Sequence, residues 1–430
     1  MAETTEPSAD EPQPDVPTAG GGPQGATPPS WAEPATNHYL WRSIKTPLLA
    51  VVAALLVGAI LIVFTDDDAL GEWAGLFRDP LGAFSASWTA ISESYAALFT
   101  GAFGHPTEIA SAIGSGDLDQ IQSALAPISE MVVTTTPLIF VGLSVAVGFR
   151  AGLFNIGAEG QMNLGAIMAA AVGFSFPGLP GPIHLVLVIL GGFVGGAMWG
   201  AIPGFLKAKT GAHEVITTIM LNFVAVSLVL WLLSTDFFRQ QAEPIAKPVI
   251  PRFPHLLGTD LRVHLGIVVA LLVAWGVAWL LNRTTVGFEF RAVGSNPDAA
   301  RAAGMSPTAI TVSAMTLSGG LAGLAGANQL LSVTPSLLPG FAAGLGFDGI
   351  AVALLAGARP GGVVAASFLF GALRAGGRSM QIATQTPIDI VVVIQALVIA
   401  FVAAPALVRT MFRMKEVRGE ATAFAKGWGG

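Results

Sequence analysis

Residues 154–166 read FNIGAEGQMNLGA, and long apolar runs lie on both sides of them. The stretch contains three glycines and four polar side chains, Asn155, Glu159, Gln161 and Asn163. A carboxylate within a membrane span costs about 2.5–3.5 kcal/mol, so it usually faces a bundle interior or water. We expect a broken or bent helix here, whose freed backbone groups line a cavity. The alternative is a short cytoplasmic loop in which Glu159 is simply solvated.

The composition of the chain places it in a membrane. Of its 430 residues, 53% are hydrophobic and 11% are charged, and there is no cysteine. A soluble domain carries about 25% charged residues. Apolar runs of about 20 residues recur and do not alternate with polar positions, which favours helices over a transmembrane barrel. The sequence therefore predicts an all-α, polytopic integral membrane protein, and it excludes disulfide and thiolate chemistry.

About ten apolar segments are predicted, with some of them broken or re-entrant. They cover residues 46–64, 132–149, 162–179, 183–205, 214–234, 263–281, 309–332, 341–357, 361–377 and 387–408. The eighth is short and glycine-rich, which is typical of a half-helix or a re-entrant element. The fourth carries Gly191, Gly192, Gly195, Gly196, Gly200 and Gly204 at four-residue spacings. Such spacings let helix backbones approach closely in lipid.

Lysine and arginine residues predict the orientation. With the N-terminus in the cytoplasm, 14 of the 21 basic residues fall on the inner side and 7 on the outer side. Both termini are then expected in the cytoplasm. Arg374 and Arg378 fit this topology least well, because they fall on the outer side.

The predicted domain organisation has three parts. They are a disordered acidic, proline-rich tail (1–45), a transmembrane domain (46–408) and a C-terminal tail (409–430), both tails being cytoplasmic. The N-terminal tail is read as a tolerated solvated segment, with a docking role as the alternative. Within the domain, we expect short surface helices in the extracytoplasmic connection 65–131 and an extended cap over 235–262.

Two further groups of polar residues lie in apolar segments. Glu214, Thr218 and Asn222 follow one another at four-residue spacing, so they share one face of a helix. Asp348 stands between glycines, and Asn328 precedes it in the adjoining segment. Inside a span, such residues are expected to face inward.

Several kinds of function are disfavoured by the sequence. It has no G-x-x-x-x-G-K-[ST] motif, so this chain is not expected to bind ATP through a P-loop. No set of metal ligands or basic aromatic surface indicates a metal or nucleic acid. An integral-membrane enzyme that uses Glu159 and Asp348 as acid–base groups stays open as an alternative.

Four stretches together carry a family resemblance. GLFNIGAEGQMNLGA, GAHEVITTIMLN, RAVGSNPDAARAAGMS and GFDGIAVALLAGARPGG resemble, in this order, the permease subunits of bacterial ABC importers. The resemblance is to the branched-chain amino acid and simple sugar permease superfamily, and within it to the nucleoside and simple sugar branch. It covers residues from about 130 to 408.

The resemblance implies a set of partners in the bacterial cytoplasmic membrane. The chain would form half of a translocation pathway with a second, related permease, and it would work with a cytoplasmic ATPase subunit and an extracellular substrate-binding lipoprotein. It would bind no cofactor itself, since ATP and Mg belong to the ATPase. Residues 282–307 would form the ATPase-coupling loop, with Arg291, Gly294, Asn296, Ala299, Ala300, Arg301 and Gly304 as its contact residues. The residues also suit a short helix there: Pro297 fits its first turn, Asn296 or Ser295 can cap it, and Gly304 can end it.

The cargo implied by the resemblance is a nucleoside, with simple sugars and then branched-chain amino acids as alternatives. The expected pathway residues are Asn155, Glu159, Gln161, Asn163, Glu214, Thr218, Asn222, Asn328 and Asp348. Their amides and carboxylates can exchange hydrogen bonds with hydroxyls and nucleobases. Two rival classes stay open: an ion-coupled secondary transporter that uses Glu159, Glu214 and Asp348, and a structural or receptor membrane protein.

Overall fold

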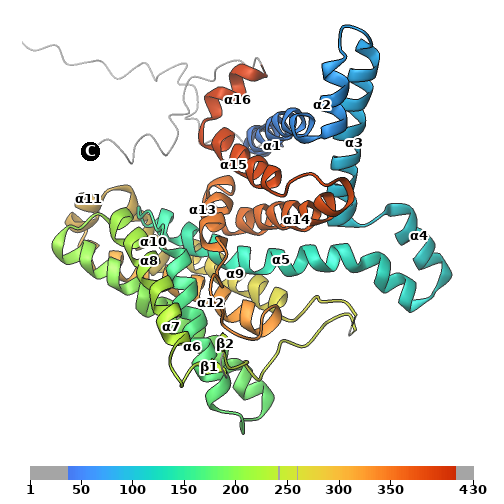
Figure 1. Cartoon of the computed structure of the whole chain (residues 1–430). Coiled ribbons are helices and arrows are strands. Elements are labelled where there is room, and N and C mark those ends of the chain that lie inside the picture. The colour runs from blue at the N-terminus through green and yellow to red at the C-terminus, as the bar shows by residue number, and fades with distance from the viewer. Residues whose placement is uncertain (1–36, 241–242, 259, 413–430) are drawn as a thin grey trace, which may run out of the picture. The chain divides into compact units, whose positions relative to one another are not determined.

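The computed structural model describes residues 37–240, 243–258 and 260–412 (Figure 1). The chain divides into two units, residues 1–45 and 46–430, and the elements of the second unit carry the site. The helices are α1 (Asn37–Thr65), α2 (Asp67–Ala74), α3 (Pro80–Phe103), α4 (Pro106–Ser115), α5 (Leu118–Arg150), α6 (Ala158–Ser175), α7 (Gly181–Thr210), α8 (Glu214–Leu233), α9 (Gly266–Arg283), α10 (Thr285–Ser295), α11 (Pro297–Ala302), α12 (Pro307–Ser332), α13 (Leu345–Leu355), α14 (Pro360–Thr384), α15 (Asp389–Ala403) and α16 (Pro405–Met411). One short antiparallel hairpin pairs β1 (Arg239–Gln240) with β2 (Glu243–Ala246).

Six of the described helices have the length and apolarity of a full membrane span. They are α5, α7, α8, α9, α12 and the part of α1 from Leu48 to Thr65. The other four predicted segments contain α6, α13, α14 and α15. The 11 residues of α13 make it about 16 Å long, too short for a hydrocarbon core of about 30 Å. The structure thus supports a polytopic helical membrane protein and does not bear out the count of ten spans.

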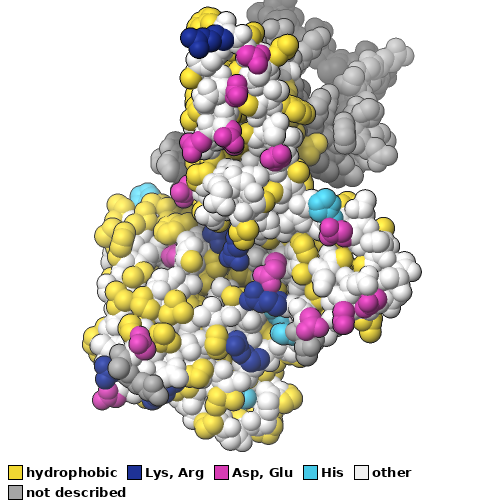
Figure 2. All heavy atoms as spheres, turned by 45° about the vertical axis from the view of Figure 1, so that its right-hand side comes forward, with side chains coloured by type: hydrophobic (Ala, Val, Ile, Leu, Met, Phe, Trp, Pro, Cys, Tyr) yellow, Lys and Arg dark blue, Asp and Glu magenta, His cyan; other side chains and the backbone are white. Residues whose placement is uncertain are grey.

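The outer surface of the bundle is strongly apolar. Trp275, Phe223 and Trp231 expose 70%, 67% and 61% of their area, and all three are on helices of spanning length. Figure 2 shows hydrophobic side chains over wide areas of one face. Such contiguous apolar surface is rare on soluble monomers and is expected where side chains face lipid.

Two glycine stripes on α7 set the centre of the packing. The stripe of Gly192, Gly196, Gly200 and Gly204 faces α12, where a Cβ at Gly196 would lie 2.2 Å from the carbonyl oxygen of Gly319. The stripe of Gly191 and Gly195 faces α6, where a Cβ at Gly195 would lie 2.6 Å from the carbonyl oxygen of Leu164. The predicted close approach of backbones is confirmed, and it involves two neighbours of α7 rather than one.

Replacing Gly196 by alanine should destabilise the bundle by about 1–3 kcal/mol, because α7 and α12 must move apart to admit the methyl group. Gly276 provides the matched control, since a Cβ there meets nothing within 4 Å and alanine is the better helix former. The melting temperature in detergent should fall for Gly196→Ala and stay level or rise for Gly276→Ala. Equal melting temperatures for the two variants would contradict this packing.

Three predicted connections differ from the structure in part. Helix α1 begins at Asn37, inside the expected tail, whereas residues 1–36 and 413–430 lie outside the described ranges. In the connection 65–131, α2 and α4 are short, but α3 has 24 residues and buries a stripe of small residues, and α5 already begins at Leu118. The stripe packs on α14, where a Cβ at Gly376 would meet the backbone of Leu98.

The expected cap over 235–262 is largely extended. The backbone N–H groups of Ala246, at the end of β2, and of Val249 and Phe253 after it donate to carbonyls between residues 331 and 337, at distances of 2.8–3.0 Å. These bonds hold the cap on the last turn of α12 and the segment that follows it. The cap therefore closes the end of the bundle at which α12 ends.

Candidate functional site

The helix break at the opening stretch is confirmed. Helix α5 ends at Arg150, α6 begins at Ala158, and Gly152 between them has a left-handed φ of +70°. The Leu153 N–H donates to the carbonyl of Gly148 at 2.9 Å, which turns the chain back on the end of α5. Only 8% of Glu159 is exposed, so the solvated-loop alternative is wrong.

A buried amide and hydroxyl network holds this junction. The Asn155 side chain donates to Gln161 Oε1 and to Ser318 Oγ, each at 2.8 Å, and it accepts the N–H of Gly157 at 2.9 Å. Ser318 in turn donates to the carbonyl of Ser144 at 2.7 Å. The side chains of Asn155 and Gln161 bond to each other, and through Ser318 they join α5, α6 and α12. In this conformation these bonds support the helix break.

Asn222 caps α6 from a neighbouring helix. Its Oδ1 accepts the N–H of Gly160 at 2.9 Å, and its Nδ2 donates to the carbonyl of Ile156 at 3.0 Å. The first N–H groups of a helix have no partner within the helix, and α6 has no side-chain cap of its own. Asn222 therefore fixes the start of α6 against α8.

Glu159 caps the start of α13 in the same way. Its two carboxylate oxygens accept the N–H groups of Gly344 and Gly346, at 2.9 and 2.8 Å. The two helices touch at this point, because a Cβ at Gly346 would lie 2.2 Å from the backbone nitrogen of Glu159. A negative charge near the N-termini of both α6 and α13 is favourable to both helix dipoles.

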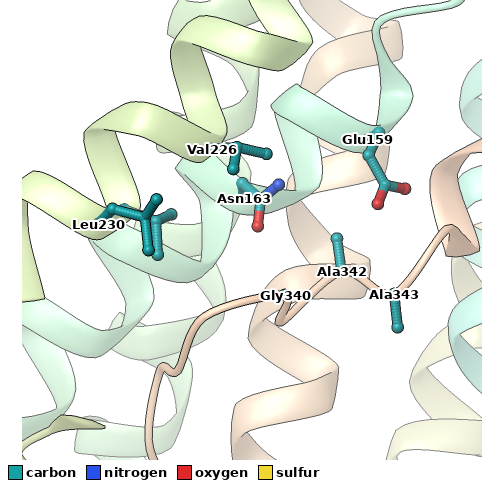
Figure 3. A pocket seen from close by; sticks show the side chains of 8 residues that line it. Glu159, Asn163, Val226, Leu230, Gly340, Ala342 and Ala343 are labelled. Atoms are coloured by element: carbon teal, nitrogen blue, oxygen red, sulfur yellow. The ribbon is translucent and has the colours of Figure 1, made fainter. Parts of the chain in front are cut away.

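A cavity of about 160 Å³ opens beside this carboxylate (Figure 3). It is lined by Glu159, Asn163, Val226, Val229, Leu230, Gly340, Ala342 and Ala343. In Figure 3 the Glu159 carboxylate and the Asn163 amide face the loop that carries Gly340. The Asn163 amide forms no hydrogen bond within the described part of the chain, so it is free to bind a ligand. The cavity combines one polar end with an apolar wall from α8.

Glu214 and Thr218 lie apart from this cavity. Glu214 pairs with Lys207 at 2.6 Å and accepts the N–H of Phe154 at 3.5 Å, while the Thr218 hydroxyl donates to the carbonyl of Glu214. These bonds link the turn between α7 and α8 to the loop before α6. Lys207 is a partner that sequence reasoning missed, although it stands close to Glu214 across a three-residue turn.

Asp348 pairs with Arg374 across α13 and α14. The Asp348 Oδ2 lies 2.5 Å from Arg374 Nη2, and 22% and 29% of the two side chains are exposed. The topology counts Arg374 and Arg378 on the outer side, at and just beyond the end of the predicted segment 361–377, but α14 continues to Thr384 and places both within a helix. This pairing compensates the charge of Arg374, and Asp348 does not line the cavity beside Glu159.

Asn328 lies near the end of α12, about 15 Å along the helix from Ser318. It is 2% exposed, and neither end of its amide has a hydrogen-bond partner within the described residues. Its Oδ1 would lie 2.3 Å from a Cβ at Gly266, and the ring of His264 adjoins the same point. Asn328 therefore belongs to a second polar site, close to the start of α9.

His264 makes this second site sensitive to pH. The ring is 3% exposed and accepts the N–H of Gly266 at 3.1 Å. Burial, followed by the charges of His255 and Arg262, lowers the pKa of His264 from 6.5 to about 4. The folded protein thus binds this proton less readily than the unfolded chain does, so its stability is complete above pH 6.5 and declines as the pH falls toward 4.

We expect the stability to fall by up to about 3 kcal/mol over that range. His264→Asn should remove this decline, because asparagine can accept the Gly266 N–H but does not titrate. Melting temperatures of the two proteins, measured in detergent across the pH range, check this. Parallel pH profiles would show that another group is responsible.

The short helix predicted in the segment 282–307 is confirmed as α11. Asn296 Oδ1 accepts the N–H groups of Asp298 and Ala299 at 3.1 and 3.0 Å, Pro297 occupies the first turn, and Gly304 has a φ of +87°. Ala299 and Arg301 are exposed. Ala300 is only 4% exposed, so it packs inward and offers no contact surface.

The segment before α11 contacts the helix break directly. A Cβ at Gly294 on α10 would lie 2.7 Å from the backbone at Arg150, Ala151 and Gly152. The predicted coupling segment and the stretch that begins the cavity wall therefore meet backbone to backbone. The sequence predicts both the helix break and the segment 282–307, but it does not predict that they are in contact.

Comparison with known proteins places the chain among permeases. Residues 128–403 match the family described as branched-chain amino acid transport system / permease component. The guanosine ABC transporter permease protein NupP of Bacillus subtilis is 36% identical over 87% of this chain and 97% of its own length. The nucleoside ABC transporter permease protein NupB of Lactococcus lactis subsp. cremoris is 31% identical, over 90% and 98%.

A glucose ABC transporter permease protein, TsgB13 of Haloferax volcanii, is 33% identical over 86% of this chain and 89% of its own length. No solved structure matches the chain significantly. The family match extends over more than half of the 430 residues and includes the helix break, the cavity and α11. The chain belongs to the permease component family of branched-chain amino acid transport systems.

Proposed function

We propose that this chain is a permease subunit of an ATP-driven importer of nucleosides. The observation that carries the proposal is its similarity, over nearly its whole length, to two permeases named for guanosine and for nucleosides. The similarity to a glucose permease keeps a simple sugar as the second candidate cargo. The family description leaves a branched-chain amino acid as the third.

The cavity beside Glu159 is the proposed place where cargo passes. The Asn163 amide can donate to and accept from a sugar hydroxyl or a nucleobase, and the carboxylate of Glu159 keeps lone pairs beyond the two that bind α13. Val226, Val229 and Leu230 offer an apolar wall to the face of a base. A cavity with one polar end and one apolar wall suits weak binding of the cargo. We therefore assign tight binding of the cargo to the extracellular binding lipoprotein.

The proposed complex contains a second permease, an ATPase and a binding lipoprotein. Two permeases of Bacillus subtilis named for guanosine, NupP and NupQ, both resemble this chain, which supports pairing of two related subunits. The ATPase would dock on the exposed residues of α11, such as Ala299 and Arg301. Its movement would reach the cavity through the contact between Gly294 and Gly152. Both termini would be cytoplasmic, and this chain would hold neither ATP nor Mg.

Uptake of labelled uridine tests the cargo, in host cells that lack the gene and in cells complemented with it. Unlabelled nucleosides, ribose, glucose and leucine serve as competitors. We expect uptake to require the gene and to be reduced by nucleosides alone. Loss of uptake on ATP depletion, with the proton gradient intact, would separate this importer from an ion-coupled carrier. Competition by glucose or leucine instead would replace the nucleoside assignment.

A substitution at Asn163 tests whether the cargo binds in the cavity beside Glu159. Asn163→Ala should lower uptake while the protein remains as abundant as the unmodified chain, because the Asn163 side chain makes no hydrogen bond that holds the fold. Thr217→Ala, which changes a half-exposed hydroxyl on the same helix as the apolar wall, is the matched control. Equal uptake by both variants would place the cargo elsewhere.

A further inference from the structure

Three arginines meet at one end of the bundle. Arg150 is the last residue of α5, and its Nε donates to the carbonyl of Ala358 at 2.9 Å, next to Arg359. Helix α10 reaches the same place, since a Cβ at Gly294 would lie 2.7 Å from the carbonyl oxygen of Arg150, and Arg291 is one turn earlier on α10. The positive charges of Arg359 and Arg291 both repel the guanidinium of Arg150.

Within the described residues, no carboxylate balances this cluster. The ion pairs that the structure shows involve other basic residues, and neither Arg291 nor Arg359 forms a side-chain hydrogen bond. The Nη1 atom of Arg291 is buried and has no partner. Three guanidinium groups that lie close together repel one another, and this repulsion disfavours the packing of α5 against α10. A bound anion would offset the repulsion, so the arrangement indicates a site for an anionic ligand.

The surroundings of the cluster identify the kind of anion. Helix α10 begins two residues after the end of α9, a helix of spanning length, so it emerges at the edge of the membrane. Val286 and Phe288 on α10 are 43% and 55% exposed, although they are apolar. Exposed apolar residues beside basic ones at a membrane edge are typical of a surface that contacts lipid, and basic pockets between spanning helices bind anionic headgroups.

We propose that Arg150, Arg291 and Arg359 bind the phosphate of an anionic phospholipid headgroup. Arginine suits this ligand because its planar fork of donors matches the oxygens of a phosphate. The acyl chains would lie along the exposed apolar side chains of α10 and α9. The site is distinct from the cargo cavity and from the exposed face of α11, and it does not depend on which solute the importer carries.

The test is a titration of the purified full-length chain in a non-ionic detergent, with the melting temperature as the readout. Phosphatidylglycerol, phosphatidylcholine and inorganic phosphate are added separately. We expect phosphatidylglycerol to stabilise the protein, and the other two to have little effect at equal phosphate concentration. Each of Arg150→Gln, Arg291→Gln and Arg359→Gln should weaken lipid binding, so that the half-saturating lipid concentration rises about 5-fold. In the triple variant it should rise about 100-fold.

Arg283→Gln is the matched control, since Arg283 is an exposed arginine at the end of α9 and belongs to no cluster. It should keep the response to phosphatidylglycerol. Equal stabilisation of the triple variant would overturn the proposal, as would an equal response to phosphatidylcholine. Saturation by inorganic phosphate alone would show a free-anion site rather than a lipid site. A triple variant that fails to fold leaves the single variants, with their 5-fold shifts, to decide.

Discussion

Replacing Gly294 by valine is expected to reduce uptake by about 100-fold while the ATPase remains bound, because a misplacement of about 1 Å can cost that much. A Cβ at this position would lie 2.7 Å from three backbone atoms of residues 150–152, and no side-chain movement can relieve contacts with backbone. Helix α10 would have to move away from the loop that leads to α6. The exposed residues of α11, where we propose that the ATPase docks, would keep their positions.

Uptake in complemented cells measures this effect, together with copurification of the ATPase and its stimulation by the substrate-loaded binding protein. The matched control is Ser295→Val, which adds a side chain of the same kind at the next residue, where the side chain is exposed. The control should transport at nearly the normal rate. Normal uptake by Gly294→Val would show that the contact with residues 150–152 does not transmit the movement. Loss of the bound ATPase would instead make Gly294 part of the docking surface.

The parts of the fold that follow from local rules were predictable. The apolar runs indicated a helical membrane protein, the glycine spacings of α7 indicated close packing, and the cap and turn residues of α11 indicated a short helix. Each of these depends on residues within a few positions of one another. Which segments are full spans was less predictable. Helix α13 is apolar but has only 11 residues, whereas α6 has 18 residues and is too polar at its start to count as a span.

The roles of individual polar residues were not predictable, since their partners are remote in sequence. Glu159 binds backbone groups 185 and 187 residues later, and Asn155 binds a serine 163 residues later. No periodicity in the sequence reports such a pairing. The sequence groups Asp348 with the pathway because it is acidic and lies between glycines, whereas in the structure its charge is balanced by Arg374. Of the expected pathway residues, Glu159 and Asn163 line the cavity, while Asn155, Gln161 and Asn222 form hydrogen bonds at the helix break.

Replacing Glu159 by glutamine should reduce uptake by about 10- to 100-fold, with a smaller change in abundance. Glutamine presents one oxygen and one NH₂ group where the carboxylate presents two oxygens, so the N–H of Gly344 or of Gly346 would face another donor. A buried N–H without a partner costs about 1–3 kcal/mol, and loss of the charge removes a favourable interaction with two helix dipoles. The start of α13 and the cavity loop at Gly340 should loosen.

Hydrogen exchange tests this mechanism independently of transport, because the amides of Gly344 and Gly346 should exchange faster in the variant. The matched control is Glu130→Gln, which breaks an ion pair with Arg262 whose two side chains are 36% and 46% exposed. Exposed pairs contribute about 1 kcal/mol or less, so the control should keep both its uptake and its exchange rates. If Glu159→Gln loses uptake without faster exchange, the carboxylate acts on the cargo directly. If uptake and exchange both stay normal, Glu159 is needed neither for cargo nor to hold α13, and the cavity loses its polar end.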